Sequence, residues 1–249
     1  MNHWGILLCL QKFKINPSII NVMEHWFSIG SAQVRWNNAL SEAVFLTAGV
    51  RQEGILSPLL FSAFIDVVLS ELGSTNKGCF IKGACFNSFL YADDLLLLSN
   101  SLVDLQFLLS KCLVIFKELD IEINILKSSC LRVGPRFRSA CKSMLVDNLP
   151  LPWVKEAVYL GVTLKSGPLF SCLWRTSRGA FYSCSNSLLG ALGCNPNIGV
   201  ILHLFRSNCI PKLTYGIEAV SLSPADLKSF AFAYNGFLPK SSRLKITRL

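Results

Sequence analysis

The chain has 249 residues, of which 51% are apolar and only 16% are charged, so it can bury a sizeable core and is not of the disordered class. Lysine and arginine number 24 against 15 acidic residues, which gives a formal net charge of +9. Such an excess favours a polyanionic partner, nucleic acid or anionic lipid, and leaves an ordinary basic surface as the alternative.

The mean hydropathy of +0.45 is high, so a membrane protein has to be considered. No run reaches the about 18 uninterrupted apolar residues of a membrane-spanning helix, because residues such as Asp66, Glu71 and Asp93 interrupt the runs. The first residues also lack the pattern of a secretory signal peptide. We therefore expect an intracellular protein, in the nucleus or the cytoplasm and not secreted. Its ten cysteines are then expected to be reduced thiols rather than disulfides or zinc ligands.

In the first region, a capping residue followed by proline marks two helix starts. Residues 16–17 (Asn-Pro) predict a helix through about residue 27. Residues 57–58 (Ser-Pro) predict a second helix, which Gly73 ends and which is apolar almost all round, so we expect it to be buried on every side. Ser101 and Asp104 predict a capping box for a third helix. Short strands are predicted at residues 33–36, 44–47, 80–81, 86–99, 121–125, 130–133 and 158–164.

After about Lys165 the sequence becomes mainly helical. Helices are predicted at residues 171–192, 198–209 and 224–237, the second of them ending before Pro211. We therefore expect an α+β fold in two domains. Residues 1–165 would form a split sheet with helices on one face, its strands at 86–99 buried on both faces, and residues 166–249 would form a helical region.

Two adjacent carboxylates, Asp93 and Asp94, stand inside the apolar run "FLYADDLLLLSN", residues 89–100. The apolar arms on either side can pair as a hairpin with the carboxylates at its tip. Aspartate is a common turn residue, so a turn without a metal is one interpretation. The other is a hard-oxygen site for Mg²⁺, which these two carboxylates would form with a third from a neighbouring strand. From this stretch alone, both remain open.

Three further stretches bear on the choice: "GVRQEGILSPLLFSAFID" (49–66), "ELDIEINILKSSCL" (118–131) and "VYLGVTL" (158–164). Together with Tyr-Ala-Asp-Asp, and in this order, they resemble the reverse transcriptase domain of non-LTR (LINE-type) retrotransposons. "IPKLTYGIEAV" (210–220) resembles a segment that follows the thumb in these elements. The resemblance implies an RNA-directed DNA polymerase with a palm and a helical thumb. It implies two Mg²⁺ ions at the primer 3′-hydroxyl, and an RNA template, a DNA primer and nucleoside triphosphates as partners.

The resemblance also implies roles for single residues near the chemistry. Asp93 is the metal-binding aspartate of the palm hairpin, and Asp94 is its neighbour, with a less direct part in metal binding. Tyr91 packs near the primer end. Lys127 is the basic residue that protonates or stabilises the departing pyrophosphate, with a solvated lysine as the alternative.

Two further groups match positions that contact nucleic acid. Arg51 and Gln52 belong to the turn that contacts the template and the incoming nucleotide. Tyr159, Leu160 and Gly161 match the turn that grips the primer strand, where a glycine lets backbone approach backbone closely.

The sequence also departs from the family pattern. Residues 2–4 (Asn-His-Trp) resemble the end of the family's Phe-Asp-x-Val-Asn-His-Trp segment, so the first palm aspartate is expected upstream of Met1, in an N-terminally truncated palm whose open edge a partner would cover. Asp66 lies on a predicted helix and is not expected to replace it. Glu53 stands where the family has glycine, and its bulk and charge oppose the approach of phosphate. We therefore expect an incomplete Mg²⁺ site and impaired polymerase activity. The alternative is a basic nucleic-acid-binding remnant of a mobile element without chemistry.

Overall fold

The computed structural model describes residues 1–191 and 197–243, with side chains through Phe237. The chain divides into two compact units. The N-terminal unit comprises Met1–Ser129 and Cys141–Pro152, and the C-terminal unit comprises Cys130–Ala140 and the chain from Trp153 onward. Each unit combines helices with short strands, in keeping with the expected α+β class. The sequence placed a domain boundary near residue 165, whereas the strands just before it belong to the C-terminal unit in the structure.

Two helices open the N-terminal unit. α1 (His3–Lys12), which is not among the helices expected from the sequence, begins after Asn2, whose side chain caps its first turn. α2 (Pro17–Ser28) begins as predicted, with the side chain of Asn16 as its cap. The two helices pack with the next helix, α3 (Ser57–Gly73), around a cluster of buried residues: Ile6, Leu7, Cys9, Leu10, Ile20, Met23, Leu60 and Phe64.

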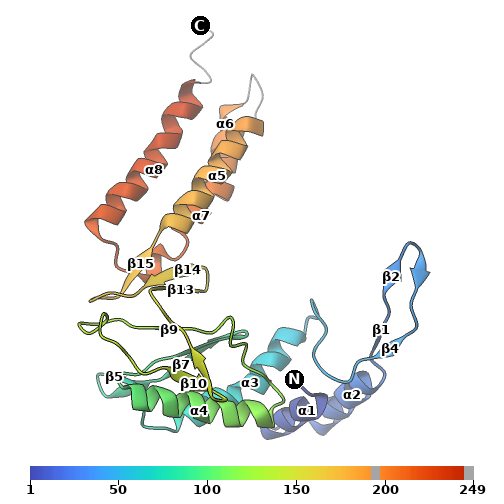
Figure 1. Ribbon diagram of the computed structural model, residues 1–249. Helices are drawn as coiled ribbons and strands as arrows, with labels where there is room; N and C mark the ends of the chain where they lie inside the picture. The colour runs from blue at the N-terminus through green and yellow to red at the C-terminus, as the bar shows by residue number, and fades with distance from the viewer. Residues whose placement is uncertain (192–196, 244–249) are drawn as a thin grey trace. The chain divides into compact units, whose positions relative to one another are not determined.

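A β arm follows α2. β1 (Ser31–Ala32) pairs with β4 (Val44–Phe45), and β2 (Arg35–Trp36) pairs with β3 (Ala39–Leu40), all antiparallel. The strands predicted at 33–36 and 44–47 thus lie on this arm, split into shorter ladders. The arm extends from α2 as a narrow ribbon (Figure 1), and its apolar side chains are exposed.

A second core joins α3 (Ser57–Gly73) and α4 (Leu102–Glu118) to a hairpin of β7 (Ser88–Tyr91) and β8 (Asp94–Leu97). α4 begins at the predicted cap, Ser101. α3 contacts β7 and α4 contacts β8. The fully or nearly fully buried members of this core are Ile65, Val68, Leu72, Leu108, Cys112, Ile115 and Phe116.

Two expectations about burial in this core are wrong. α3 is buried along one side only, and Leu59 on its other side is 67% exposed. The hairpin is likewise covered on one face, where Leu90 and Leu95 pack, while Phe89 is exposed on the other. Side chains of a strand alternate between the two faces, so helices on one face leave the other to water.

The strands that the structure describes do not join into the single split sheet expected from the sequence. The hairpin β7–β8 is a sheet of two strands, and so are β5 (Cys79–Ile81) with β6 (Ala84–Phe86) and β10 (Met144–Val146) with β11 (Leu149–Leu151). Residues 121–125, expected as a strand, pair with none of the described strands. Of these strands, β7 and β8 contact α3 and α4, and the side chain of Gln106 on α4 exchanges hydrogen bonds with the backbone of Leu145 on β10.

The C-terminal unit contains a three-stranded antiparallel sheet of β13 (Glu156–Tyr159), β14 (Val162–Lys165) and β15 (Ser171–Leu173), and a parallel pair of β9 (Cys130–Leu131) with β12 (Trp153–Val154). The single strand expected at 158–164 is therefore a hairpin, because the chain reverses at Leu160 and Gly161. The segment 171–173, expected to begin a helix, is a strand that completes this sheet.

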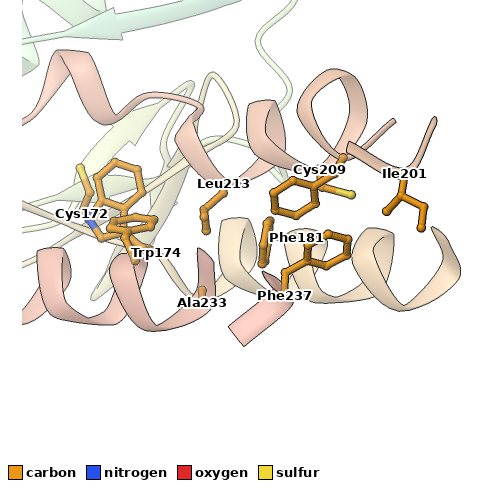
Figure 2. Packing of buried hydrophobic residues seen from close by; sticks show 10 residues of the cluster. Cys172, Trp174, Phe181, Ile201, Cys209, Leu213, Ala233 and Phe237 are labelled. Atoms are coloured by element: carbon orange, nitrogen blue, oxygen red, sulfur yellow. The ribbon is translucent and has the colours of Figure 1, made fainter. Parts of the chain in front are cut away.

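The remaining elements of this unit are helical: α5 (Arg175–Ala191), α6 (Ile198–Leu204), the π-helix η1 (Phe205–Cys209), α7 (Ile210–Thr214), the 3-10 helix η2 (Ile217–Ala219) and α8 (Pro224–Arg243). α5 and α8 run side by side (Figure 1). Aromatic rings fill the core between them (Figure 2), where Phe205 stacks on Phe237 with ring centroids 3.8 Å apart and Phe181 meets Phe205 edge-on. Residue 192 of the helix predicted at 171–192 lies outside the described residues. Among the described helices, none combines the length and the apolarity that crossing a membrane requires.

The helix that begins at Ile198 does not end before Pro211, contrary to expectation. It continues through the π-helix η1 into α7, where Pro211 occupies the second position. Proline lacks an N–H and its ring crowds the preceding turn, so it normally breaks a helix. The wider π turn just before it accommodates the ring, and the helical path continues.

Candidate functional site

The two aspartates lie at the tip of the β7–β8 hairpin, which confirms the predicted hairpin. Tyr91 pairs with Asp94, so Ala92 and Asp93 form a two-residue loop and Asp94 is the first residue of β8. Asp93, Asp94 and Tyr91 are all exposed. Both carboxylates are therefore accessible to a ligand from solvent and carry no cost of burying a charge.

The loop backbone is strained at Ala92, whose φ is +50°. A positive φ at the first of two loop residues is the pattern of a type II′ turn, a position that glycine favours. A residue with a Cβ in the left-handed region is disfavoured by about 1–2 kcal/mol. The packing around the hairpin has to supply this energy, and strain of this kind is common beside functional side chains.

Packing on α3 holds the hairpin in place. Leu90 and Leu95 join the core that α3 and α4 share. At the base of the hairpin, the amide nitrogen of buried Asn87 donates to the carbonyl of Leu72 at 2.7 Å and to the hydroxyl of Thr75 at 3.3 Å. The hairpin is thus fixed both by apolar contacts and by a polar link to the end of α3.

The tip of the hairpin presents two carboxylates, the kind of ligand that a Mg²⁺ site uses. Carboxylate oxygens such as those of Asp93 and Asp94 suit this ion. In residues 1–191 and 197–243, however, no three His, Cys, Asp or Glu side chains gather closely enough to hold a metal. Asp66 borders a hollow of about 170 Å³ together with Ala92, but it does not complete such a group. Among the described residues, no third side chain of these four types therefore joins Asp93 and Asp94.

Arg51 and Gln52 lie in a tight turn that leads into α3. The N–H of Gly54 donates to the carbonyl of Arg51 at 3.0 Å, and the hydroxyl of Ser57 donates to the same oxygen at 2.5 Å. Ser57 is the first residue of α3, and its hydroxyl ties the turn to the helix. The sequence predicted Ser57 as the capping residue instead. The cap position belongs to Leu56, which makes no capping hydrogen bond. The side chains of Arg51 and Gln52 are exposed.

Glu53 occupies the third position of this four-residue turn with a φ of +62°. A positive φ at the third position is the pattern of a type II turn, which requires glycine or asparagine there. The sequence had marked Glu53 for its bulk and charge. The structure adds a backbone reason why a glycine fits this position better.

The first residues of the chain pair with the segment that enters this turn, a contact that no pattern in the sequence indicates. Asn2 forms an antiparallel bridge to Ala48, and the N–H of Gly49 donates to the carbonyl of Met1 at 2.8 Å. The His3 ring nitrogen Nε2 lies 2.9 Å from the carbonyl of Gly49. Asn2 and His3 belong to the segment that resembles the family, but no local pattern indicates where they pack.

Lys127 lies in a turn that follows α4, with an exposed side chain. Its backbone N–H donates to the carbonyl of Asn124 at 3.2 Å. Within the described part of the chain, no hydrogen bond or ion pair joins Lys127 or Arg51 to Asp93. The role of Lys127 toward pyrophosphate stays a prediction.

Tyr159, Leu160 and Gly161 lie at the β13–β14 turn of the C-terminal unit. Leu160 has a φ of +47° and Gly161 a φ of +76°, the pattern of a type I′ hairpin turn. The hydroxyl of Tyr215 donates to the carbonyl of Leu160 at 2.9 Å, a contact that no local signal in the sequence indicates. The contact of this turn with a primer stays a prediction.

Comparison with known proteins places these features in a family. The family described as "Reverse transcriptase (RNA-dependent DNA polymerase)" matches residues 1–164, a segment that includes the Asp93 hairpin and the Arg51 turn. The chain is 21% identical over 238 residues to a retrovirus-related Pol polyprotein from the type-1 retrotransposable element R2 of Popillia japonica, a match that covers 92% of this chain and 38% of the relative.

Two further relatives are similar over less of their length. The retrovirus-related Pol polyprotein from the type-2 retrotransposable element R2DM of Drosophila melanogaster is 25% identical over 196 residues, 79% of this chain and 17% of the relative. The transposon TX1 uncharacterized 149 kDa protein of Xenopus laevis is 28% identical over 175 residues, 67% of this chain and 13% of the relative. The chain thus spans less than two fifths of each of these three relatives. The family match and these relatives show that the chain belongs to the reverse transcriptase family, in its non-LTR retrotransposon branch.

Proposed function

We propose that the chain is the palm-bearing part of an RNA-directed DNA polymerase of a non-LTR retrotransposon. Its partners are then an RNA template, a DNA primer and nucleoside triphosphates, inside the cell. One observation carries the proposal: the Tyr-Ala-Asp-Asp hairpin lies within the matched segment, and its two carboxylates are exposed at a tip that α3 and α4 support.

In this proposal the side chains keep the roles that the resemblance implies. Asp93, with Asp94 beside it, supplies oxygen ligands to Mg²⁺, which would activate the primer 3′-hydroxyl when bound. Lys127 stabilises the departing pyrophosphate. Arg51 and Gln52 contact the template strand and the incoming nucleotide from a turn that Ser57 holds.

We further propose that the chain by itself extends primers poorly. In the described part of the chain, no third His, Cys, Asp or Glu side chain lies close enough to join the two aspartates around a metal. Glu53 adds an exposed negative charge next to the residues that would face phosphate. A further segment or a partner protein that pairs with an open edge of the β7–β8 hairpin is expected to improve activity, because unpaired edges are ready sites for strand addition.

The net charge of +9 favours a second candidate function, which is nucleic-acid binding without chemistry. The two candidates share their ligand and differ in turnover. Binding alone therefore does not separate them, whereas nucleotide addition does.

The test combines binding and primer extension on the same purified chain. Binding of a fluorescent DNA primer annealed to an RNA template is measured by anisotropy at about 50 mM and about 200 mM salt, where phosphate contacts weaken steeply. Extension is measured with Mg²⁺ and nucleoside triphosphates for the wild type, for Asp93→Asn and for Asp66→Asn. Asp66→Asn is the comparison, because Asp66 is an exposed carboxylate that borders the same hollow as Ala92 but belongs to α3 and not to the tip.

We expect salt-sensitive binding by all three proteins and weak extension that Asp93→Asn abolishes and Asp66→Asn retains. Binding without any extension would favour the second candidate. Strong extension that depends on Asp93 would support the polymerase and contradict its impairment. Extension that survives Asp93→Asn would overturn the assignment of the site. No binding at the lower salt would overturn the assignment of nucleic acid as the partner.

A further inference from the structure

The turn at Leu160–Gly161 has a backbone conformation that needs outside support. Leu160 has a φ of +47°, in the left-handed region, where its side chain is strained. Because this is a two-residue hairpin loop, the amides of Leu160 and Gly161 lie outside the ladder between Tyr159 and Val162. Backbone amides outside a ladder are suitable donors to phosphate oxygens.

That support comes from a segment about fifty residues further along the chain, between α7 and η2. The hydroxyl of Tyr215 donates to the carbonyl of Leu160 at 2.9 Å. The ring of Tyr215 lies against the other loop residue, since a Cβ added to Gly161 would come within 3.2 Å of its Cε1 atom. One side chain thus holds both residues of the turn.

The next residue, Gly216, fixes the same hairpin from the side. It has a φ of +76°, and a Cβ added there would come within 2.8 Å of the Cγ2 atom of Val162. A real Cβ does not approach another carbon so closely, so only glycine allows this segment to rest on β14. The close packing of Gly216 on Val162 and the hydrogen bond of Tyr215 to Leu160 are separate contacts with the same hairpin.

We propose that Tyr215 is a positioning residue for nucleic acid: it holds the Leu160–Gly161 turn in the one conformation in which its backbone receives the primer strand. The choice of a primer strand as ligand rests on the proposed function, whereas the contact between Tyr215 and the turn does not. Tyr215 is 55% exposed, so neither its ring nor its hydroxyl is required to fill a core. Its removal should therefore change the order of the turn and the recognition of a primer end more than the stability of the unit.

The test uses Tyr215→Phe, which removes the hydroxyl and keeps the ring, and Tyr215→Ala, which removes both. Tyr182→Phe is the matched control, because Tyr182 is a 39% exposed tyrosine on α5 of the same unit, distant in sequence from the turn. Hydrogen–deuterium exchange of the peptide 156–165 reports on the order of the turn. Anisotropy reports the affinity for a DNA–RNA duplex with a recessed primer end and, separately, for single-stranded RNA.

We expect faster exchange in peptide 156–165 and about fivefold weaker binding of the recessed duplex for Tyr215→Phe, which corresponds to about 1 kcal/mol. The loss should be larger for Tyr215→Ala and absent for Tyr182→Phe, and binding of single-stranded RNA should change by less than about twofold. Unchanged exchange in both Tyr215 variants would overturn the inference. Faster exchange with unchanged duplex affinity would overturn its nucleic-acid part while the proposed function stands. If the wild type does not bind the duplex, both the proposed function and the proposed role of the turn in primer binding are overturned. The exchange data would then still decide whether Tyr215 orders the turn.

Discussion

Replacing Glu53 by glycine is expected to stabilise the N-terminal unit, because the turn at Arg51–Gly54 places this residue at a φ of +62°. A residue with a Cβ is disfavoured there by about 1–2 kcal/mol. Glycine removes that cost but gains freedom in the unfolded chain, which offsets about 0.4–1 kcal/mol. The net expectation is a gain of about 1 kcal/mol in the free energy of unfolding, or about 3 °C in melting temperature for a chain of this size.

The assay is chemical denaturation followed by circular dichroism, with Glu53→Ala as the matched control. Alanine removes the charge of Glu53 and keeps the Cβ, so it should leave the stability within about 0.5 kcal/mol of the wild type. Equal stabilisation by alanine and glycine would show that the charge, and not the backbone, disfavours Glu53. A loss of stability in Glu53→Gly would refute the strain argument directly.

Three further predictions concern the core and the surface of the N-terminal unit. Asn87→Ala should lower the free energy of unfolding by about 1–3 kcal/mol, because it removes two hydrogen bonds that link the hairpin to α3; urea denaturation measures this, and a loss below about 0.5 kcal/mol would contradict it. Burial raises the pKa of the Cys112 thiol from 9.0 to about 12. The stability that comes from keeping this thiol protonated is therefore fully present below pH 9 and is lost as the pH rises toward 12, so urea midpoints at pH 8 and pH 10.5 should differ more in the wild type than in Cys112→Ala. The ion pair of Lys77 with Asp104 is short, at 2.6 Å, but both side chains are about a third exposed, so a double-mutant cycle to alanine should give a coupling of no more than about 1 kcal/mol.

Local chemical signals explain which elements were predictable from the sequence. Asn16 and Ser101 begin helices where expected, because a capping side chain bonds to the N–H groups of its own first turn and needs no distant partner. The Asp93 hairpin was predictable for a similar reason, since its two arms are adjacent in the chain. The burial of this hairpin was not predictable, because the number of its faces that helices cover depends on the packing of the whole unit.

The missed features depend on contacts between distant segments or on backbone angles. Pro211 was expected to end a helix, and only the π turn before it explains why the helix continues. The pairing of Met1 with Gly49 and the support of Leu160 by Tyr215 join residues that no periodicity connects. For the candidate site, the sequence supplies the residues proposed to carry chemistry, but it does not indicate that Glu53 and Ala92 have positive φ angles, which glycine favours.

The bridge between Asn2 and Ala48 has a practical consequence for experiments on this chain. It is antiparallel, so residues attached before Met1 would run alongside Val50 and toward Arg51, the turn proposed to face the template. A bulky affinity tag at that end would begin beside the surface whose binding is to be measured. The residues placed before Met1 are therefore an experimental variable. Comparing tagged and cleaved protein in the same binding assay would show whether the start of the chain and the template occupy the same surface.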